Sequence, residues 1–427
     1  MRIKDFHRNV KIRIAVYLAF GIAQFTTFPF MAVYFDKYYG MTVTGVLLAT
    51  SMVASLFSSA IGGFYADRVG RKRLMVISEA VFLVSYLVMT FANSPWLESP
   101  LLTFVAYLVN NVCWGMYSPA DEAMLLDVTT AENRQLMYAI FYWLTNLTIA
   151  IGASIGALLF ESYRFELFAV MALVVLGSLL TTVFFIQETY QPPRRDLAVQ
   201  PHLLRALLHN YLAILKDRAF MYYFIAGTLA MAVEFQLTNG IGIHLAKTMK
   251  DQVLMHIGGH PFHVDGVKML GFLQTENTVL VVLLAALAAK WSKRFPEKWV
   301  LLFGITLNAA GYSVMTFSSA PLVLFAAMLF ATLGEMSGVP IRQAYLGDIT
   351  PEHARSSYVA VNGMTFGLAR VLSSGGVALY AVIPAWGIGI ISFLVGMTGL
   401  LFYFAVVPAA HARRNASVAR PSGDFTQ

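Results

Sequence analysis

The fold is decided by one stretch, Gly63-Phe-Tyr-Ala-Asp67-Arg68-Val-Gly70-Arg71-Lys72. It joins two apolar runs, one from about residue 44 and one from residue 74, and each is long enough to cross a bilayer. Its glycines permit a sharp backbone path. Four cations lie in it or directly after it, of the kind that gathers in cytoplasmic loops: Arg68, Arg71, Lys72 and Arg73. We therefore predict a tight, charged loop between two membrane spans.

The composition of the 427 residues is typical of a membrane protein, because 58% are hydrophobic and only 12% are charged. Soluble domains carry about 25% charged residues. The net charge of +7 follows from the cytoplasmic bias of lysine and arginine, so it indicates no nucleic-acid partner. A single cysteine, Cys113, excludes an internal disulfide and a cysteine metal cage. We expect an all-α integral membrane protein without a metal site.

Apolar runs of spanning length follow one another along the whole chain. They fall at roughly 13–36, 43–66, 74–93, 100–126, 135–160, 165–187, 218–247, 267–290, 298–318, 321–347, 356–383 and 386–409, which makes twelve. Of the 30 lysines and arginines, 23 fall at the N-terminus, in the loops after even-numbered spans or in the C-terminal tail. This bias predicts that both termini are cytoplasmic.

The longest polar interruption, residues 188–217, divides the chain into two halves of six spans, 1–187 and 218–427. We expect it to be a cytoplasmic linker. An offset of 221 residues matches the two halves at four positions: Pro119 with Pro340, Asp127 with Asp348, Thr129 with Thr350 and Arg134 with Arg355. The offset is about half the chain, as a duplication requires, and parallel repeats of this kind occur in transporters.

The G-x-x-x-D-R-x-G-R-K pattern resembles the loop between the second and third helices of the major facilitator superfamily. The resemblance implies twelve transmembrane helices in two pseudo-symmetric six-helix bundles. It also implies a cytoplasmic latch, in which Asp67 engages the start of the eleventh span and Arg71 pairs with Asp127. The residues for conformational gating are then Gly63, Asp67, Arg68, Gly70, Arg71, Asp127 and Arg134. The alternative is a set of solvated loop charges that only set the topology.

Four charged residues fall well inside predicted spans: Glu234, Glu276, Glu335 and Arg370. Such groups are costly in a membrane and mark functional sites. A carboxylate in low dielectric binds a proton more readily, and a nearby cation weakens that binding. A glutamate whose surroundings alternate between the two sides of the membrane therefore meets the minimum need of a proton-coupled transporter. The alternative is a static ion pair of Arg370 with Glu276 or Glu335.

A closer resemblance covers nearly the whole chain and rests on two patterns. These patterns, similar to those of LmrP-type multidrug/proton antiporters, are Thr332-Leu-Gly-Glu335 with Pro340 and Leu346-Gly-Asp348, and Ala131-Glu132-Asn133-Arg134 with Tyr142-Trp143 and Asn146-Leu147. The resemblance makes Glu335 the coupling glutamate of the tenth span. The chain departs from these relatives at two positions. They carry an acidic residue in the fifth span where this chain has Phe141, and another in the seventh span near the position of Thr238. In this chain Glu234 lies one helical turn from Thr238.

Other polar residues carry less weight. Glu79 lies about two turns into its span, within reach of a loop cation. Gln24, Asn146 and Asn239 either line a cavity or bond to a neighbouring helix. The outer loop before span 267–290 holds a group whose spacing permits a metal, although the intervening glycines and proline favour a plain loop: His256, His260, His263 and Asp265.

We expect a secondary active transporter and not an enzyme, because the chain has no phosphate-binding G-x-x-x-x-G-K-[ST] pattern and no H-E-x-x-H or G-x-S-x-G hydrolase pattern. The resemblances imply proton-coupled efflux of hydrophobic or cationic compounds by alternating access. The proton gradient supplies the energy, no cofactor is needed, and the protein is expected to be a monomer among membrane lipids. The alternatives are a proton-coupled carrier of a specific metabolite, sugar or lipid-like molecule, and a transport-dead sensor or scaffold. The candidate residues for proton coupling and substrate binding are Glu335, Glu234, Glu276, Arg370, Asn146 and Gln24.

Overall fold

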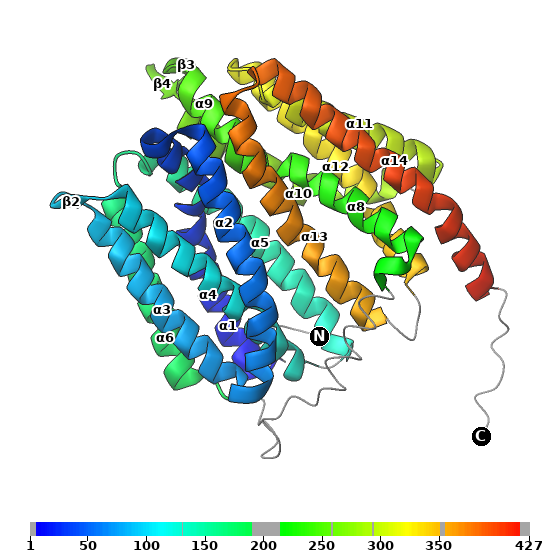
Figure 1. Cartoon of the computed structure of the whole chain (residues 1–427), viewed down its shortest axis with the longest axis horizontal. Coiled ribbons are helices and arrows are strands. Elements are labelled where there is room, and N and C mark those ends of the chain that lie inside the picture. Colours follow the sequence, from blue (N-terminus) through cyan, green and yellow to red (C-terminus); the bar gives the residue numbers. More distant parts are fainter. Residues whose placement is uncertain are drawn as a thin grey trace.

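The computed structural model describes residues 6–129, 131–189, 214–257, 259–292, 294–350 and 355–418. Figure 1 shows a bundle of long helices with short hairpins at one end. The first half contains α1 (Arg8–Phe25), η2 (Phe28–Phe30), α2 (Met31–Val69), α3 (Arg71–Ala92), β1 (Asn93–Ser94), β2 (Leu97–Glu98), α4 (Pro100–Asp127), α5 (Ala131–Leu159) and α6 (Arg164–Phe185). The second half contains α8 (Arg218–Glu234), η3 (Leu237–Ile241), α9 (Gly242–Thr248), β3 (Gln252–Ile257), β4 (His260–Val264), α10 (Gly266–Ser292), α11 (Glu297–Met315), α12 (Pro321–Ile349), α13 (Arg355–Gly376), η5 (Val377–Ala381) and α14 (Ala385–Val418).

The described helices agree with the twelve predicted spans. Eight helical segments are long and apolar enough to cross a membrane. The first of these, Arg8–Gly63, has 56 residues; one straight helix of that size, at 1.5 Å per residue, would be about 84 Å long, which is far more than one bilayer needs. Its backbone is interrupted at Gly40, with φ 74° and ψ 167°, between the first two predicted spans. Three more helices, α4, α11 and α13, occupy the remaining predicted spans.

Two spans that the sequence predicts as continuous are broken in the structure. In the first, α1 ends at Phe25 and a short 3-10 segment containing Pro29 follows, since proline lacks the N–H that a helix needs. In the seventh, α8 ends at Glu234 and a π-helical segment separates it from α9. Such π-helical segments are rare and often mark functional sites.

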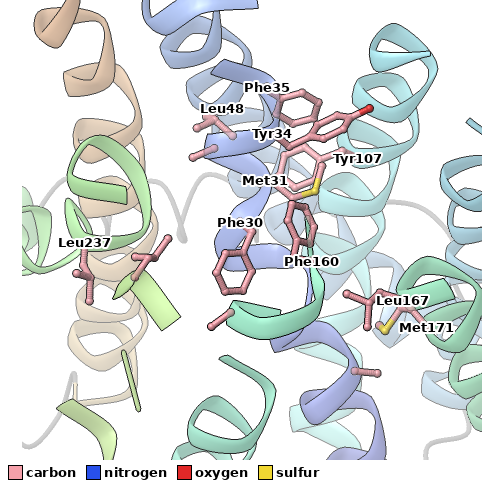
Figure 2. Packing of buried hydrophobic residues seen from close by; sticks show 14 of the residues in the cluster. Phe30, Met31, Tyr34, Phe35, Leu48, Tyr107, Phe160, Leu167, Met171 and Leu237 are labelled. Carbon is pink, nitrogen blue, oxygen red and sulfur yellow. The ribbon is translucent and has the colours of Figure 1, made fainter. Parts of the chain in front are cut away.

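Buried aromatic residues gather next to the break in the first span. Figure 2 shows Phe35 close to Tyr107 there and Phe30 beside Phe160, and all four are buried. The ring centroids of Phe30 and Phe160 lie 5.3 Å apart, and those of Phe35 and Tyr107 lie 5.5 Å apart. Lipid is as apolar as these side chains, so close packing and not transfer from water holds the helices together.

Glycines let neighbouring helices approach closely. A Cβ atom added at Gly62 of α2 would lie 2.5 Å from the Cα of Met116 in α4. A Cβ at Gly152 of α5 would lie 2.6 Å from the carbonyl oxygen of Ile22 in α1. Any side chain at these positions would push the helices apart, as expected where small residues form helix interfaces in membranes.

The two halves touch mainly toward the end of the molecule that carries the hairpins. There, Ser154 Oγ and Thr275 Oγ1 lie 2.7 Å apart between α5 and α10, and Lys247 of α9 reaches Asp36 of α2. Figure 1 shows α2 and α13 close together near this end and farther apart toward the opposite one. The opposite end is the one that the sequence predicts to be cytoplasmic.

Candidate functional site

A pocket inside the second half brings together Glu234 and Glu335, two of the predicted residues. It lies between α8, α11, α12 and α14 and is lined by Ala230, Val233, Glu234, Gly304, Ile305, Asn308, Gly334, Glu335, Gly338, Arg342 and Gly396. Close packing of α11 on α12 forms its floor, since a Cβ at Gly334 would lie 2.5 Å from the Asn308 backbone nitrogen.

Glu335 on α12 is held by a residue that the sequence analysis missed. Asn277 of α10 donates from Nδ2 to the Glu335 carboxylate at 3.3 Å and to the Thr332 hydroxyl at 3.0 Å. Thr332 in turn donates to the Met328 carbonyl one turn earlier in α12. The carboxylate is thus oriented from α10, and a lone asparagine within an apolar span was the only signal in the sequence.

Glu234 is the last residue of α8 and directly precedes the break in the seventh span. It interacts electrostatically with both Glu335 and Arg342. Arg342 donates from Nη2 to the backbone carbonyl of Glu335 at 3.4 Å. Two carboxylates and one guanidinium therefore share the pocket. The sequence analysis did not count Arg342 among the candidates.

Arg370 does not join this group. Its guanidinium carbon lies 4.6 Å from the ring centroid of Phe366 and 5.2 Å from that of Phe235, which is cation–π geometry. It also interacts electrostatically with Tyr107 of α4, in the other half. The suggested static pair of Arg370 with Glu276 or Glu335 is thus not among the described contacts, because aromatic faces occupy the guanidinium.

The other predicted pocket residues lie apart from one another. Glu276 of α10 is half-buried, and among the described residues its Oε2 atom has no hydrogen-bond partner. Asn146 donates to the Tyr142 carbonyl of its own helix at 2.8 Å, and Asn239 donates to the Ser373 hydroxyl at 3.0 Å. Gln24 is half-buried near the end of α1, before the break in the first span.

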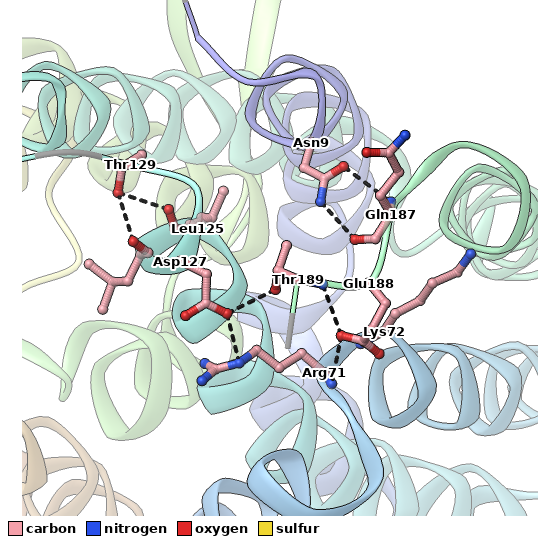
Figure 3. A network of polar contacts seen from close by, with 10 residues as sticks. Asn9, Arg71, Lys72, Leu125, Asp127, Thr129, Gln187, Glu188 and Thr189 are labelled. Atoms are coloured by element: carbon pink, nitrogen blue, oxygen red, sulfur yellow. Dashed lines mark hydrogen bonds and ion pairs between the residues drawn. The ribbon is translucent and has the colours of Figure 1, made fainter. Parts of the chain in front are cut away.

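The loop between α2 and α3 forms a compact polar network (Figure 3). Arg71 Nε lies 2.9 Å from Asp127 Oδ2 at the end of α4, so the structure contains the ion pair that the family resemblance implies. Gly70 joins the helices with φ 101°, a conformation that favours glycine. Glu188 accepts hydrogen bonds from the backbone N–H groups of Arg71 and Lys72 at 3.2 and 3.1 Å, and so caps α3. The sequence analysis had left Glu188 in the linker.

The remaining gating candidates differ in what the structure says of them. Gly63 is an ordinary helical residue whose added Cβ would meet only Pro119, at 3.9 Å; the residue that contacts α4 closely is Gly62. The expectation that Gly63 shapes the turn is therefore wrong, because α2 continues to Val69. Arg68 is half-buried. The side chains of Asp67 and Arg134 lie outside the described residues, as does most of the predicted linker.

Two outer contacts were not foreseen. Lys247 Nζ lies 2.8 Å from Asp36 Oδ1, and Asp36 is 7% exposed, so this ion pair joins the halves. The outer loop that the sequence favoured as plain forms the antiparallel hairpin β3–β4. Within it, His263 Nδ1 lies 2.8 Å from Asp251 Oδ2.

Comparisons with known proteins agree with this architecture. The family model described as Major Facilitator Superfamily matches residues 14–259 and 262–424. The chain therefore belongs to the major facilitator superfamily, and it is a multi-pass membrane transporter and not an enzyme.

Individual relatives are similar over most of their length. A protein of Planococcus maritimus named Na(+), Li(+), K(+)/H(+) antiporter is 32% identical, over 98% of this chain and 100% of its own. Multidrug resistance protein MdtH of Edwardsiella ictaluri is 23% identical over 82% of each chain. A POT family transporter solved with a thioalcohol-conjugated peptide has a TM-score of 0.74 at 14% identity, covering 94% of this chain and 96% of that one, which shows the shared fold alone.

Proposed function

We propose that this protein is a proton-coupled antiporter that exchanges a monovalent cation for a proton at the pocket of Glu234 and Glu335. One observation carries the proposal: two carboxylates and one guanidinium, that of Arg342, line the same pocket. The ionised group has one excess negative charge. It can be neutralised by one proton or one monovalent cation, and competition between the two for the same charge couples their opposite movements.

The surroundings suit a small, hard cation. Such ions prefer oxygen ligands, which the carboxylates of Glu234 and Glu335 and the amide of Asn308 supply. Glu234 also ends α8, and the C-terminal end of a helix carries partial negative charge. Discontinuous helices coordinate Na⁺ or H⁺ in this way in other transporters. The named activity of the Planococcus maritimus relative supports the same class of substrate.

Efflux of hydrophobic cations, the expectation from the sequence, has support from the MdtH relatives. The position of Arg370 argues against efflux of organic cations. Its guanidinium lies close enough to Tyr107 of the other half to interact with that side chain. A bound organic cation between the halves would be repelled there. The experiment below therefore includes a cationic dye as its second substrate.

The test uses proteoliposomes with an acidic interior and a pH-sensitive dye inside. External Na⁺, Li⁺ or K⁺ should dissipate the pH gradient with the wild-type protein, and Glu335→Gln and Glu234→Gln should each abolish this response. Glu161→Gln, an exposed carboxylate in the turn after α5, is the matched control and should leave it intact. Dissipation by ethidium but by none of the three ions would replace the proposal with drug/proton exchange. Equal responses from the wild type and both variants would show that this pocket is not the site of exchange.

A further inference from the structure

A second buried charge cluster lies in the first half, far along the chain from the proposed exchange pocket. It joins Arg13 of α1, Glu79 of α3 and Asp121 of α4. Arg13 is 3% exposed and Glu79 is 2% exposed. Glu79 was expected to reach a loop cation, but its cationic neighbour is Arg13, on the first span.

The guanidinium is not shared equally between the carboxylates. Arg13 Nε lies 2.7 Å from Asp121 Oδ1, whereas Nη1 lies 3.7 Å from Glu79 Oε1. The guanidinium also stacks on Tyr117, with 5.4 Å between its carbon and the ring centroid. Arg13 is thus the ion-pair partner of Asp121. The cluster contains two carboxylates but only this one guanidinium, so the charge of one carboxylate is not compensated. An uncompensated carboxylate at this depth is costly.

The two oxygens of Glu79 differ sharply. Oε1 accepts hydrogen bonds from the Ser178 hydroxyl at 2.8 Å and the Tyr117 hydroxyl at 3.3 Å. Oε2 is buried and makes no hydrogen bond of good geometry with the described residues, and the Thr182 hydroxyl is a polar neighbour of the Glu79 carboxylate. The fully buried Thr182 hydroxyl, one turn along α6 from Ser178, interacts with Glu79 and has no other partner in the described part of the chain.

We propose that Glu79 is a proton-binding site of the first half, with the proton on Oε2 and the Thr182 hydroxyl oxygen as its acceptor. A proton there gives Oε2 the hydrogen bond it lacks and cancels the excess negative charge of the cluster. The groups that face Glu79 are Arg13 from α1, Tyr117 and Asp121 from α4, and Ser178 and Thr182 from α6. Tyr17 of α1 faces Asp121 and Arg13.

The site also has a conformational consequence. Loss of the proton would leave a full charge on Glu79 and draw Arg13 from Asp121 toward it, since the guanidinium already lies between them. The side chain of Asp121 is 16% exposed and that of Glu79 is 3% exposed, so solvent approaches the cluster most closely at Asp121. Protonation would thereby be linked to the contact between α1 and α4.

The test is the infrared spectrum of the purified full-length protein at neutral pH. Glu79→Gln should lack one carbonyl band of a protonated carboxylic acid that the wild type has, and Glu161→Gln should keep it. Glutamine mimics a protonated glutamate, so Glu79→Gln should change the melting temperature by about 2 °C or less, whereas Asp121→Asn, which breaks the ion pair, should lower it by more than about 5 °C.

An unchanged carbonyl band in Glu79→Gln would overturn the proposal. So would a loss of stability, or of folding, as large as that of Asp121→Asn, because it would mean that Glu79 is an ionised partner of Arg13. Neither measurement depends on transport, so this site and the exchange pocket can fail separately.

Discussion

Two asparagines inside spans illustrate how a single side chain can be tied to a site or only to its own helix. Asn277 bridges from α10 to Glu335 and Thr332 on α12. Asn146 bonds back to Tyr142, four residues earlier in α5. The sequence analysis chose Asn146 as a candidate and passed over Asn277. Both residues are asparagines, so the residue type does not distinguish them. Only their hydrogen-bond partners show that Asn277 orients a carboxylate and that Asn146 bonds within its own helix.

Asn277→Ala should therefore weaken cation exchange, whereas Asn146→Ala should not. A hydrogen bond to a charged group contributes about 1.5–3 kcal/mol, and about 1.4 kcal/mol is tenfold in affinity. We expect the cation concentration for half-maximal dissipation of the pH gradient to shift about tenfold in Asn277→Ala. Equal values for the two variants would mean that Asn277 does not orient Glu335.

At the scale of helices, α2 and α3 are fixed by different means at their common loop. Gly70 supplies the backbone conformation of the turn. The N-terminus of α3 is capped from a distance by Glu188, at the end of the first half. Arg71 then fixes α3 to α4 through Asp127. The polar network at this loop thus has two parts: the loop motif between α2 and α3, and Glu188, which follows α6.

Neighbouring glycines on α2 provide a test of helix packing. Gly62→Ala should lower the stability of the detergent-solubilised protein by about 1–3 kcal/mol, because its Cβ would overlap the α4 backbone at Met116. Gly63→Ala should be neutral or slightly stabilising, because its Cβ would meet Pro119 at an ordinary 3.9 Å and alanine favours a helix. Thermal unfolding of the two variants measures the difference. Equal melting temperatures would show that α2 and α4 can separate without cost.

At the scale of the molecule, the halves are held at their outer ends by polar and small-residue contacts. Among the described contacts between the halves, the pair of Asp36 and Lys247 is the ion pair, and Asp36 is its buried partner. For the opposite side to close and the outer side to open, this contact must break. The pair therefore stabilises the state in which the halves touch at the end that carries the hairpins.

Lys247→Gln should shift the protein toward the outward-open state, because it leaves Asp36 buried without its cation. We expect a shift of about tenfold in the ratio of the two states, roughly 1.4 kcal/mol. Distances between spin labels on the outer ends of α2 and α9 would report it. The double variant Asp36→Lys with Lys247→Asp should restore the wild-type distribution, and Lys250→Gln, an exposed neighbour, should not change it. An unshifted distribution in Lys247→Gln would make the pair incidental.

The sequence by itself determined the class of protein and its helices. Apolar runs of spanning length and the cationic loops needed no tertiary information, because a bilayer forces the backbone into helices and selects their length. The Arg71–Asp127 pair was implied by the resemblance of the loop motif to the major facilitator superfamily. Glu234 and Glu335 could be singled out because a carboxylate within an apolar span is conspicuous by composition alone.

Only the tertiary structure decided which of these charges meet. Helical periodicity places a residue on a face, but the rotation and tilt of each helix follow from packing of small residues such as Gly62 and Gly334 against a neighbour. That packing put Arg342 and not Arg370 beside the two glutamates, and Asn277 behind Glu335. It also brought Arg13 to Glu79 and Lys247 to Asp36, residues far apart in the chain, whose attraction acts only once the helices between them are in place.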